Sequence, residues 1–199
     1  MRRLLIGAAV LACLAIPACS SGGKSGDGGV VTPPPGPVPT FLCSDSPAAP
    51  NVVVLKCGAR VSATVWRIDV VIGGPTASTD INGFNFDVVF DPLVMAYVPG
   101  SAQMGTFFLQ GGGTTLFLAA TATNPPDPGR LVVGVQLQGS TGVGSMMSEN
   151  LILAFQIKTL TASPFGPDQL KFDHFEATDS LRLPISSITF SDQIMLSFQ

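Results

Sequence analysis

INGFNFDVVFDPLVMAYVPG, at residues 81–100, is the stretch of sequence that decides the fold. In its first half, Phe84 and Phe86 alternate with Asn85 and Asp87, and the same alternation continues to residue 91. Successive side chains of a β-strand point to opposite faces, so this pattern predicts a strand at residues 83–91 with one buried face and one outward face. Pro92 ends the strand, because proline lacks the N–H group that a strand ladder needs.

The rest of the chain, from about residue 50, has the same β character. Short apolar runs are broken by glycine, proline, asparagine and aspartate, and no stretch has convincing helical periodicity. The expected strands lie at residues 52–57, 61–72, 83–91, 95–98, 106–110, 115–120, 131–138, 151–158, 169–175, 185–190 and 193–198. A chain with 46% hydrophobic and 12% charged residues can bury a sizeable core. The sequence therefore predicts one all-β domain at residues 51–199, a two-sheet sandwich.

Side-chain parity assigns an inner face to several of these strands. In the runs at residues 61–72, 131–138 and 151–158, the inner residues are Trp66, Ile68, Val70, Ile72, Leu131, Val133, Val135, Leu137, Leu151, Leu153, Phe155 and Ile157. Two segments rich in glycine or proline, at residues 111–113 and 124–129, are expected to form loops at the ends of the sandwich.

The N-terminal segment predicts secretion. Residues 1–18 hold two arginines followed by an apolar run that is too short to remain as a membrane span, which is typical of a signal peptide. The segment ends in Ile-Pro-Ala before Cys19, which resembles a bacterial lipobox, where the cysteine is lipid-modified and becomes the mature N-terminus. Acyl chains hold a protein on a membrane, and Ser20 after the cysteine favours an outer membrane or the cell surface. The alternative is an ordinary signal peptide with a chance cysteine.

Residues 19–50 are rich in glycine, serine and proline, which predicts a tether between the membrane and the sandwich. Residues 33–37 read PPPGP, a composition that favours a semi-rigid polyproline spacer. A proline-rich ligand for a partner domain is the alternative.

Cysteine usage predicts one disulfide, and the net charge excludes one class of function. Cys13 is lost with the signal peptide and Cys19 is the lipidation candidate, so Cys43 and Cys57 should form a disulfide in an oxidising exterior. Cleavage also removes Arg2 and Arg3, which takes the formal net charge from −3 to −5. Because no basic stripe exists, nucleic-acid binding is excluded.

The sequence lacks catalytic and metal-binding motifs. A nucleophile elbow, a zinc-binding HExxH and a phosphate-binding loop are all missing, so the chain is predicted not to be an enzyme and to carry no cofactor of its own. A lone His174 with two distant cysteines does not make a zinc site, and a lone strand histidine is usually structural. Asp173, Glu176 and Asp179 offer oxygen ligands for calcium near a turn, and solvated edge acids are the alternative.

Residues 83–108, GFNFDVVFDPLVMAYVPGSAQMGTFF, resemble the most recognisable segment of cohesin modules. In cohesins, a strand of the form G-F-x-F-x-L-x-Y-D-P is followed by an apolar run, a Pro-Gly turn and a segment that contains phenylalanine. The likeness continues more weakly at residues 129–135, 151–158 and 170–173.

This resemblance implies a jelly-roll sandwich of about nine antiparallel strands and a non-catalytic role on a bacterial lipoprotein. One outer sheet face would bind the two-helix, calcium-loaded dockerin module of another extracellular protein, linked to polysaccharide degradation. By position in the cohesin pattern, the binding residues are Asn85, Asp87 and Val89 on one strand and Arg130, Gln136 and Gln138 on its neighbour. A solvated sheet face is the alternative for all six.

Two other functions stay open from the sequence. The same sandwich could bind carbohydrate directly, because sugars stack on exposed aromatic rings, but parity buries Trp66 and leaves Tyr97 as the remaining candidate besides phenylalanine. The third possibility is an envelope-structural or adhesion lipoprotein with neither ligand.

Overall fold

A computed structural model describes residues 41–123, 126–139, 141–161 and 170–198. The expected signal peptide at residues 1–18, the lipidation candidate Cys19 and the tether up to residue 40 lie outside the described residues. The described residues all belong to one compact unit.

The described residues form twelve strands and one 3-10 helix. In chain order these are β1 (Phe41–Ser44), β2 (Val52–Arg60), β3 (Val65–Gly73), β4 (Gly83–Phe90), β5 (Met95–Tyr97), β6 (Gln103–Met104), η1 (Phe107–Gly111), β7 (Thr114–Thr123), β8 (Pro126–Gln138), β9 (Glu149–Thr159), β10 (Leu170–Thr178), β11 (Thr189–Ser191) and β12 (Met195–Phe198). The described helices include none with the length and hydropathy of a membrane span.

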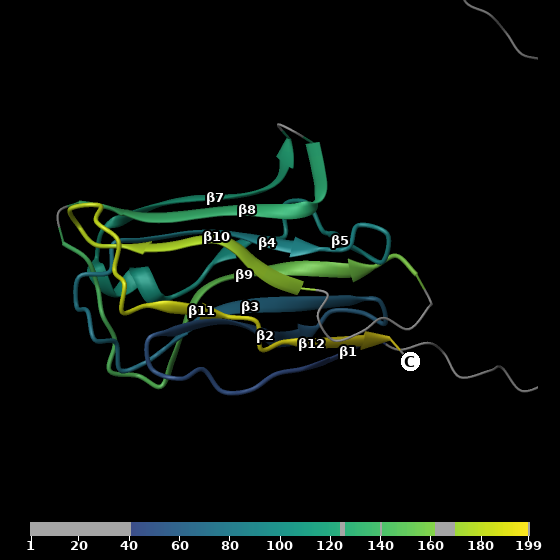
Figure 1. Cartoon of the computed structure of the whole chain (residues 1–199), viewed down its shortest axis with the longest axis horizontal. Helices are drawn as coiled ribbons and strands as arrows, with labels where there is room; N and C mark the ends of the chain where they lie inside the picture. The colour runs from purple at the N-terminus through teal and green to yellow at the C-terminus, as the bar shows by residue number, and fades with distance from the viewer. Residues whose placement is uncertain (1–40, 124–125, 140, 162–169, 199) are drawn as a thin grey trace, which may run out of the picture. The chain divides into compact units, whose positions relative to one another are not determined.

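Two sheets make the layers of a sandwich (Figure 1). One has the order β10-β4-β8-β7 and is antiparallel throughout. The other has the order β11-β2-β3-β9-β5, with β6 also paired to β9, and β1 and β12 form a separate two-stranded ribbon. The predicted all-β sandwich is therefore confirmed, and it includes one parallel pair, β11 with β2, that the antiparallel prediction did not contain.

The core lies between the two layers, and β4 contributes one row of its side chains. Phe84, Phe86, Val88 and Phe90 are buried, as the alternation predicted. Phenylalanine rings pack within the core, with the centroid of Phe86 5.3 Å from that of Phe172 on the neighbouring strand β10 and 5.9 Å from that of Phe190 in the other sheet. The opposite layer contributes buried Ile68, Val70, Ile72, Leu153, Phe155 and Ile157 to the same cluster.

Several predicted boundaries are wrong, and three of them have a local reason. Residues 61–64 form a turn between β2 and β3, in which the N–H groups of Val61 and Ser62 donate to the carbonyl of Val65. Residues 106–110 fall mostly in η1, whose Phe107 and Phe108 are both fully buried and so do not alternate in exposure. Residues 126–129 belong to β8, because the β7–β8 ladder continues past a register shift as far as Thr123 opposite Pro126.

A β-bulge also changes one parity prediction. The register between β3 and β9 shifts where Val70 faces Leu153 and Val71 faces Leu151. The extra residue, Ile152, is fully buried, whereas Leu151 is only half-buried. A bulge inserts one residue into a strand, so alternation counted from Leu153 fails on its far side.

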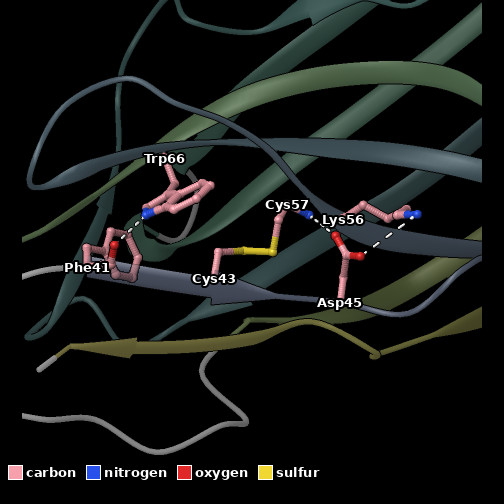
Figure 2. Close-up of a disulfide and its surroundings, with 6 residues drawn as sticks. All are labelled: Phe41, Cys43, Asp45, Lys56, Cys57 and Trp66. Carbon is pink, nitrogen blue, oxygen red and sulfur yellow. Dashed lines mark hydrogen bonds and ion pairs between the residues drawn. A yellow bond between two sulfur atoms is a disulfide. The ribbon is translucent and has the colours of Figure 1, made fainter.

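The folded domain begins earlier than residue 51. Phe41 to Ser44 pair with β12, and Cys43 and Cys57 form a disulfide with a Cα–Cα distance of 5.7 Å (Figure 2). Figure 2 also shows Trp66, whose Nε1–H donates to the carbonyl of Phe41 at 2.7 Å. Residues 41–50, assigned to the tether by composition, are therefore partly a structural strand.

Candidate functional site

The six residues that the cohesin resemblance selects lie on one sheet. Asn85, Asp87 and Val89 belong to β4, and Arg130, Gln136 and Gln138 belong to its neighbour β8. Val89 is opposite Arg130 and Gly83 is opposite Gln136, so the outward residues of both strands share a parity and a face. We call the surface made by these six residues the β4–β8 face.

Arg130 carries the positive charge of this face, at the end where it lies opposite Val89. Its Nη1 donates to Asp87 Oδ2 at 2.6 Å and to Asp173 Oδ2 at 2.8 Å, and it lies 3.1 Å from His174 Nδ1. A third carboxylate, Asp127, approaches its Nε at 3.4 Å. The guanidinium is therefore held in one position by groups from β4, β8 and β10.

These contacts shift the ionisation of both partners. The hydrogen bonds to Asp173 and Asp87 raise the pKa of Arg130, which keeps it charged. The hydrogen bond from Arg130 lowers the pKa of Asp173, with smaller help from the His174 N–H. In this ion cluster, Arg130 and Asp173 therefore stay charged over the whole neutral range.

The remaining predicted residues extend from this cluster along β4 and β8. Asn85 and Gln138 are exposed, and Val89 is half-buried beside Arg130. Gln136 donates to Asn82 Oδ1 at 3.3 Å and accepts from Arg182 Nη1 at 3.2 Å. Only Asp87 and Arg130 of the six contact each other through an ion pair.

Sequence reasoning missed the contribution of β10. Asp173 is opposite Asp87, and a bulge follows between Asp173 and Glu176. In this bulge His174 adopts a positive φ of 46° and its side chain is 74% exposed. His174 therefore lies on the surface beside the ion cluster, where its Nδ1 is 3.1 Å from Arg130 Nη1 and 3.3 Å from Asp87 Oδ2. The pairing of β10 with β4 joins segments about 85 residues apart, and no local pattern contains that information.

Sequence reasoning also missed an apolar strip on β7. Leu116 and Leu118 are 54% and 58% exposed and lie opposite Gln136 and Gly134 of β8, so they continue the β4–β8 face outward. Their alternation with Phe117 and Ala119 reads as a strand, but only the sheet order places that strand at an edge.

The described residues contain one group that could ligate a metal, formed by Asp87, Asp173 and His174, whose ligand atoms lie within 4.8 Å of one another. Arg130 Nη1 contacts all three, so a guanidinium supplies the positive charge that a cation would bring. The three acids that the sequence offered as possible calcium ligands, Asp173, Glu176 and Asp179, do not form a cluster, and Asp179 instead accepts from the N–H groups of Leu181 and Leu183.

The aromatic platform expected for carbohydrate is not at Tyr97. Its side chain is 6% exposed and its ring lies 6.4 Å from Phe155 in the core. Tyr97 is therefore a core residue, and its expected availability to a sugar is wrong.

A shallow depression of about 570 Å³ lies elsewhere, between residues 76–79, the end of η1 and residues 142–147. Its lining contains no charged side chain. A site of this composition offers neither a general base nor a nucleophile with a base beside it.

Comparison with known proteins places the fold. No protein-family model and no curated protein matches the chain. Among solved structures, a type II cohesin, A11, from Bacteroides cellulosolvens superposes with a TM-score of 0.53 at 14% identity, covering 71% of this chain and 96% of that one. The domain has the cohesin fold.

Two structures from Acetivibrio cellulolyticus are similar to this cohesin-like domain at the same level. The second type II cohesin of the adaptor scaffoldin ScaA has a TM-score of 0.52 at 12% identity and covers 71% of this chain and 86% of that one. A chain of a type II cohesin–X–dockerin complex has a TM-score of 0.51 at 11% identity, covering 70% and 96%. The two-sheet arrangement is therefore shared while almost all side chains differ.

Proposed function

We propose that the chain is a non-catalytic docking module on the cell surface, which binds the dockerin module of a second extracellular protein through its β4–β8 face. The observation that carries the proposal is the combination of the cohesin fold with a fixed ion cluster on this face. One structure of similar fold is a cohesin bound to an X-dockerin.

The β4–β8 face suits a protein partner better than a small molecule. It is a sheet surface with exposed amides at Asn85 and Gln138 and an ion cluster whose geometry is set before binding. Pre-positioned charges reduce the ordering cost of association, and complementary charges select the partner. Calcium enters this proposal through the dockerin partner, and the chain itself needs none.

Calorimetric titration with a panel of dockerins, with and without a calcium chelator, tests the proposal. Arg130→Ala should weaken binding roughly tenfold or more, because it leaves Asp87 and Asp173 without their cation at the interface. The matched control is Arg67→Ala, which removes an arginine paired with Asp69 on β3 of the other sheet and should leave the affinity unchanged. Failure of every dockerin to bind a folded domain would contradict the proposal.

The anchor is the second part of the proposal. We infer that Cys19 is acylated and that residues 20–40 carry the domain away from an outer membrane or cell surface. Cys19→Ser should move the protein from the membrane fraction to the soluble fraction and abolish labelling with a palmitate analogue. Cys13→Ser, in the cleaved segment, should change neither readout, and membrane association that survives Cys19→Ser would refute the lipid anchor.

A further inference from the structure

The strand edges of this domain are protected unequally. Edge strands expose unpaired N–H and C=O groups, and proteins shield them with charge, bulges, covering segments or short length. Within the described part of the chain, β5, β6 and β11 are three residues long or shorter. β10 carries Lys171, Asp173, His174 and Glu176, has a bulge, and is hydrogen-bonded to another segment, because its Phe172 N–H donates to Asp192 Oδ1 at 2.7 Å.

In the part of the chain that the structure describes, the edge strand β7 has none of these protections along most of its length. It is ten residues long, reads TTLFLAATAT and contains no charged residue and no proline. Among the described residues only β8 pairs with it, and its register shift comes late, between Thr121 and Ala122. Leu116, Phe117 and Leu118 are each 36% exposed or more.

The exposure of Leu118 has a structural cause. It lies opposite Gly134 on β8, which offers no side chain to cover it, and no described strand flanks it on the other side. An apolar residue in this position lacks the cross-strand contact that normally accompanies burial in a sheet.

We propose that β7 pairs antiparallel with β7 of a second copy of this chain, which joins two four-stranded sheets into one. A two-fold axis through Phe117 sets Leu116 opposite Leu118 of the second copy and Phe117 opposite Phe117 of the second copy. Leu118, which has no side-chain contact from Gly134 on one side, then contacts Leu116 of the second copy on the other side.

The strand composition favours a second copy over a different extended chain. An isologous two-fold interface brings each residue type against a copy of the same surface, so a charged strand would repel itself. β7 has no charge to oppose this pairing, and its three large apolar residues are consecutive, so the two-fold register matches all of them. Both β4–β8 faces would lie on the same side of the joined sheet.

Sedimentation equilibrium of the full chain, solubilised with an excess of detergent micelles over protein, tests the pairing. We expect a reversible monomer–dimer equilibrium. Leu118→Lys and Leu116→Glu should each weaken dimerisation roughly tenfold or more, because each buries an unpaired charge at the new strand pair. An equimolar mixture of the two variants should dimerise again, since the introduced lysine faces the introduced glutamate. This rescue would not occur if either variant had failed to fold.

Leu93→Glu is the matched control, because Leu93 is 81% exposed and lies outside β7. Its dissociation constant should equal that of the unchanged chain. If the chain stays monomeric at every concentration up to the solubility limit, the proposal is overturned. The same holds if the monomer binds extended peptides at β7 instead of a second copy. A dimer that persists in both charged variants, or a mixture that stays monomeric, overturns it as well. None of these results depends on dockerin binding, which calorimetry measures separately.

Discussion

At the scale of single residues, substitution of Phe86 tests whether one face of β4 is buried in the core. It is 1% exposed and packs against Phe172 and Phe190. Phe86→Ala should lower the free energy of unfolding by about 3–5 kcal/mol, the usual loss for a fully buried phenylalanine. Urea denaturation measures it. The matched control, Phe175→Ala, removes a ring that is 51% exposed and stacked on Phe190 at 4.7 Å, and should cost about 0.5–1.5 kcal/mol. Equal losses in the two variants would contradict the assignment of β4.

At the scale of elements, the disulfide holds β1 to the sheet. Cys43 on β1 and Cys57 on β2 are 14 residues apart, and the Asp45 carboxylate also accepts from the Cys57 N–H at 2.6 Å (Figure 2). Replacing both cysteines by serine should lower the free energy of unfolding by roughly 3 kcal/mol, because the unfolded chain regains the entropy of a closed loop of about this length. Thermal unfolding with and without a reductant measures the effect. A reductant should destabilise the unchanged chain and leave the double variant as it is, and a reductant-sensitive double variant would rule out this disulfide as the cause.

At the scale of elements, the sequence predicted part of this structure and missed the rest. The alternation in β4 and β8 predicted which side chains are inside, because strand periodicity is local. It did not predict η1, since a buried pair such as Phe107 and Phe108 reads equally as strand or turn of helix. It also did not predict β1, since its four residues are held by a distant strand and a disulfide rather than by their own pattern. The β4–β8 face follows from the cohesin resemblance and parity, whereas Asp173 and Leu118 join it through sheet order, which is a property of the whole chain.

At the scale of the whole molecule, three carboxylates in separate regions tie stability to pH. The Ser180 hydroxyl at 2.7 Å, with backbone N–H groups, lowers the pKa of Asp80, which joins the loops around residues 80, 142 and 180. Burial would raise the pKa of Glu149, but hydrogen bonds from Lys56 and the Ala48 N–H outweigh it and lower the pKa. Arg130 lowers the pKa of Asp173 on the β4–β8 face.

All three shifts have the same sign, so their effects on stability add. A group whose pKa is lower in the folded state binds more protons when unfolded, so stability is complete above the unfolded pKa values, 3.8 for aspartate and 4.5 for glutamate, and falls as pH drops through the folded values. We expect the urea midpoint to stay level from pH 8 to about pH 5 and to fall below it. Ser180→Ala should make the fall shallower, because Asp80 loses the largest cause of its shift, while Ser186→Ala, on an exposed loop, should leave the profile unchanged. A midpoint that rises below pH 4 would mean that these carboxylates are not ionised in the folded state. The ion cluster on the β4–β8 face, which contains Asp173, would then not form.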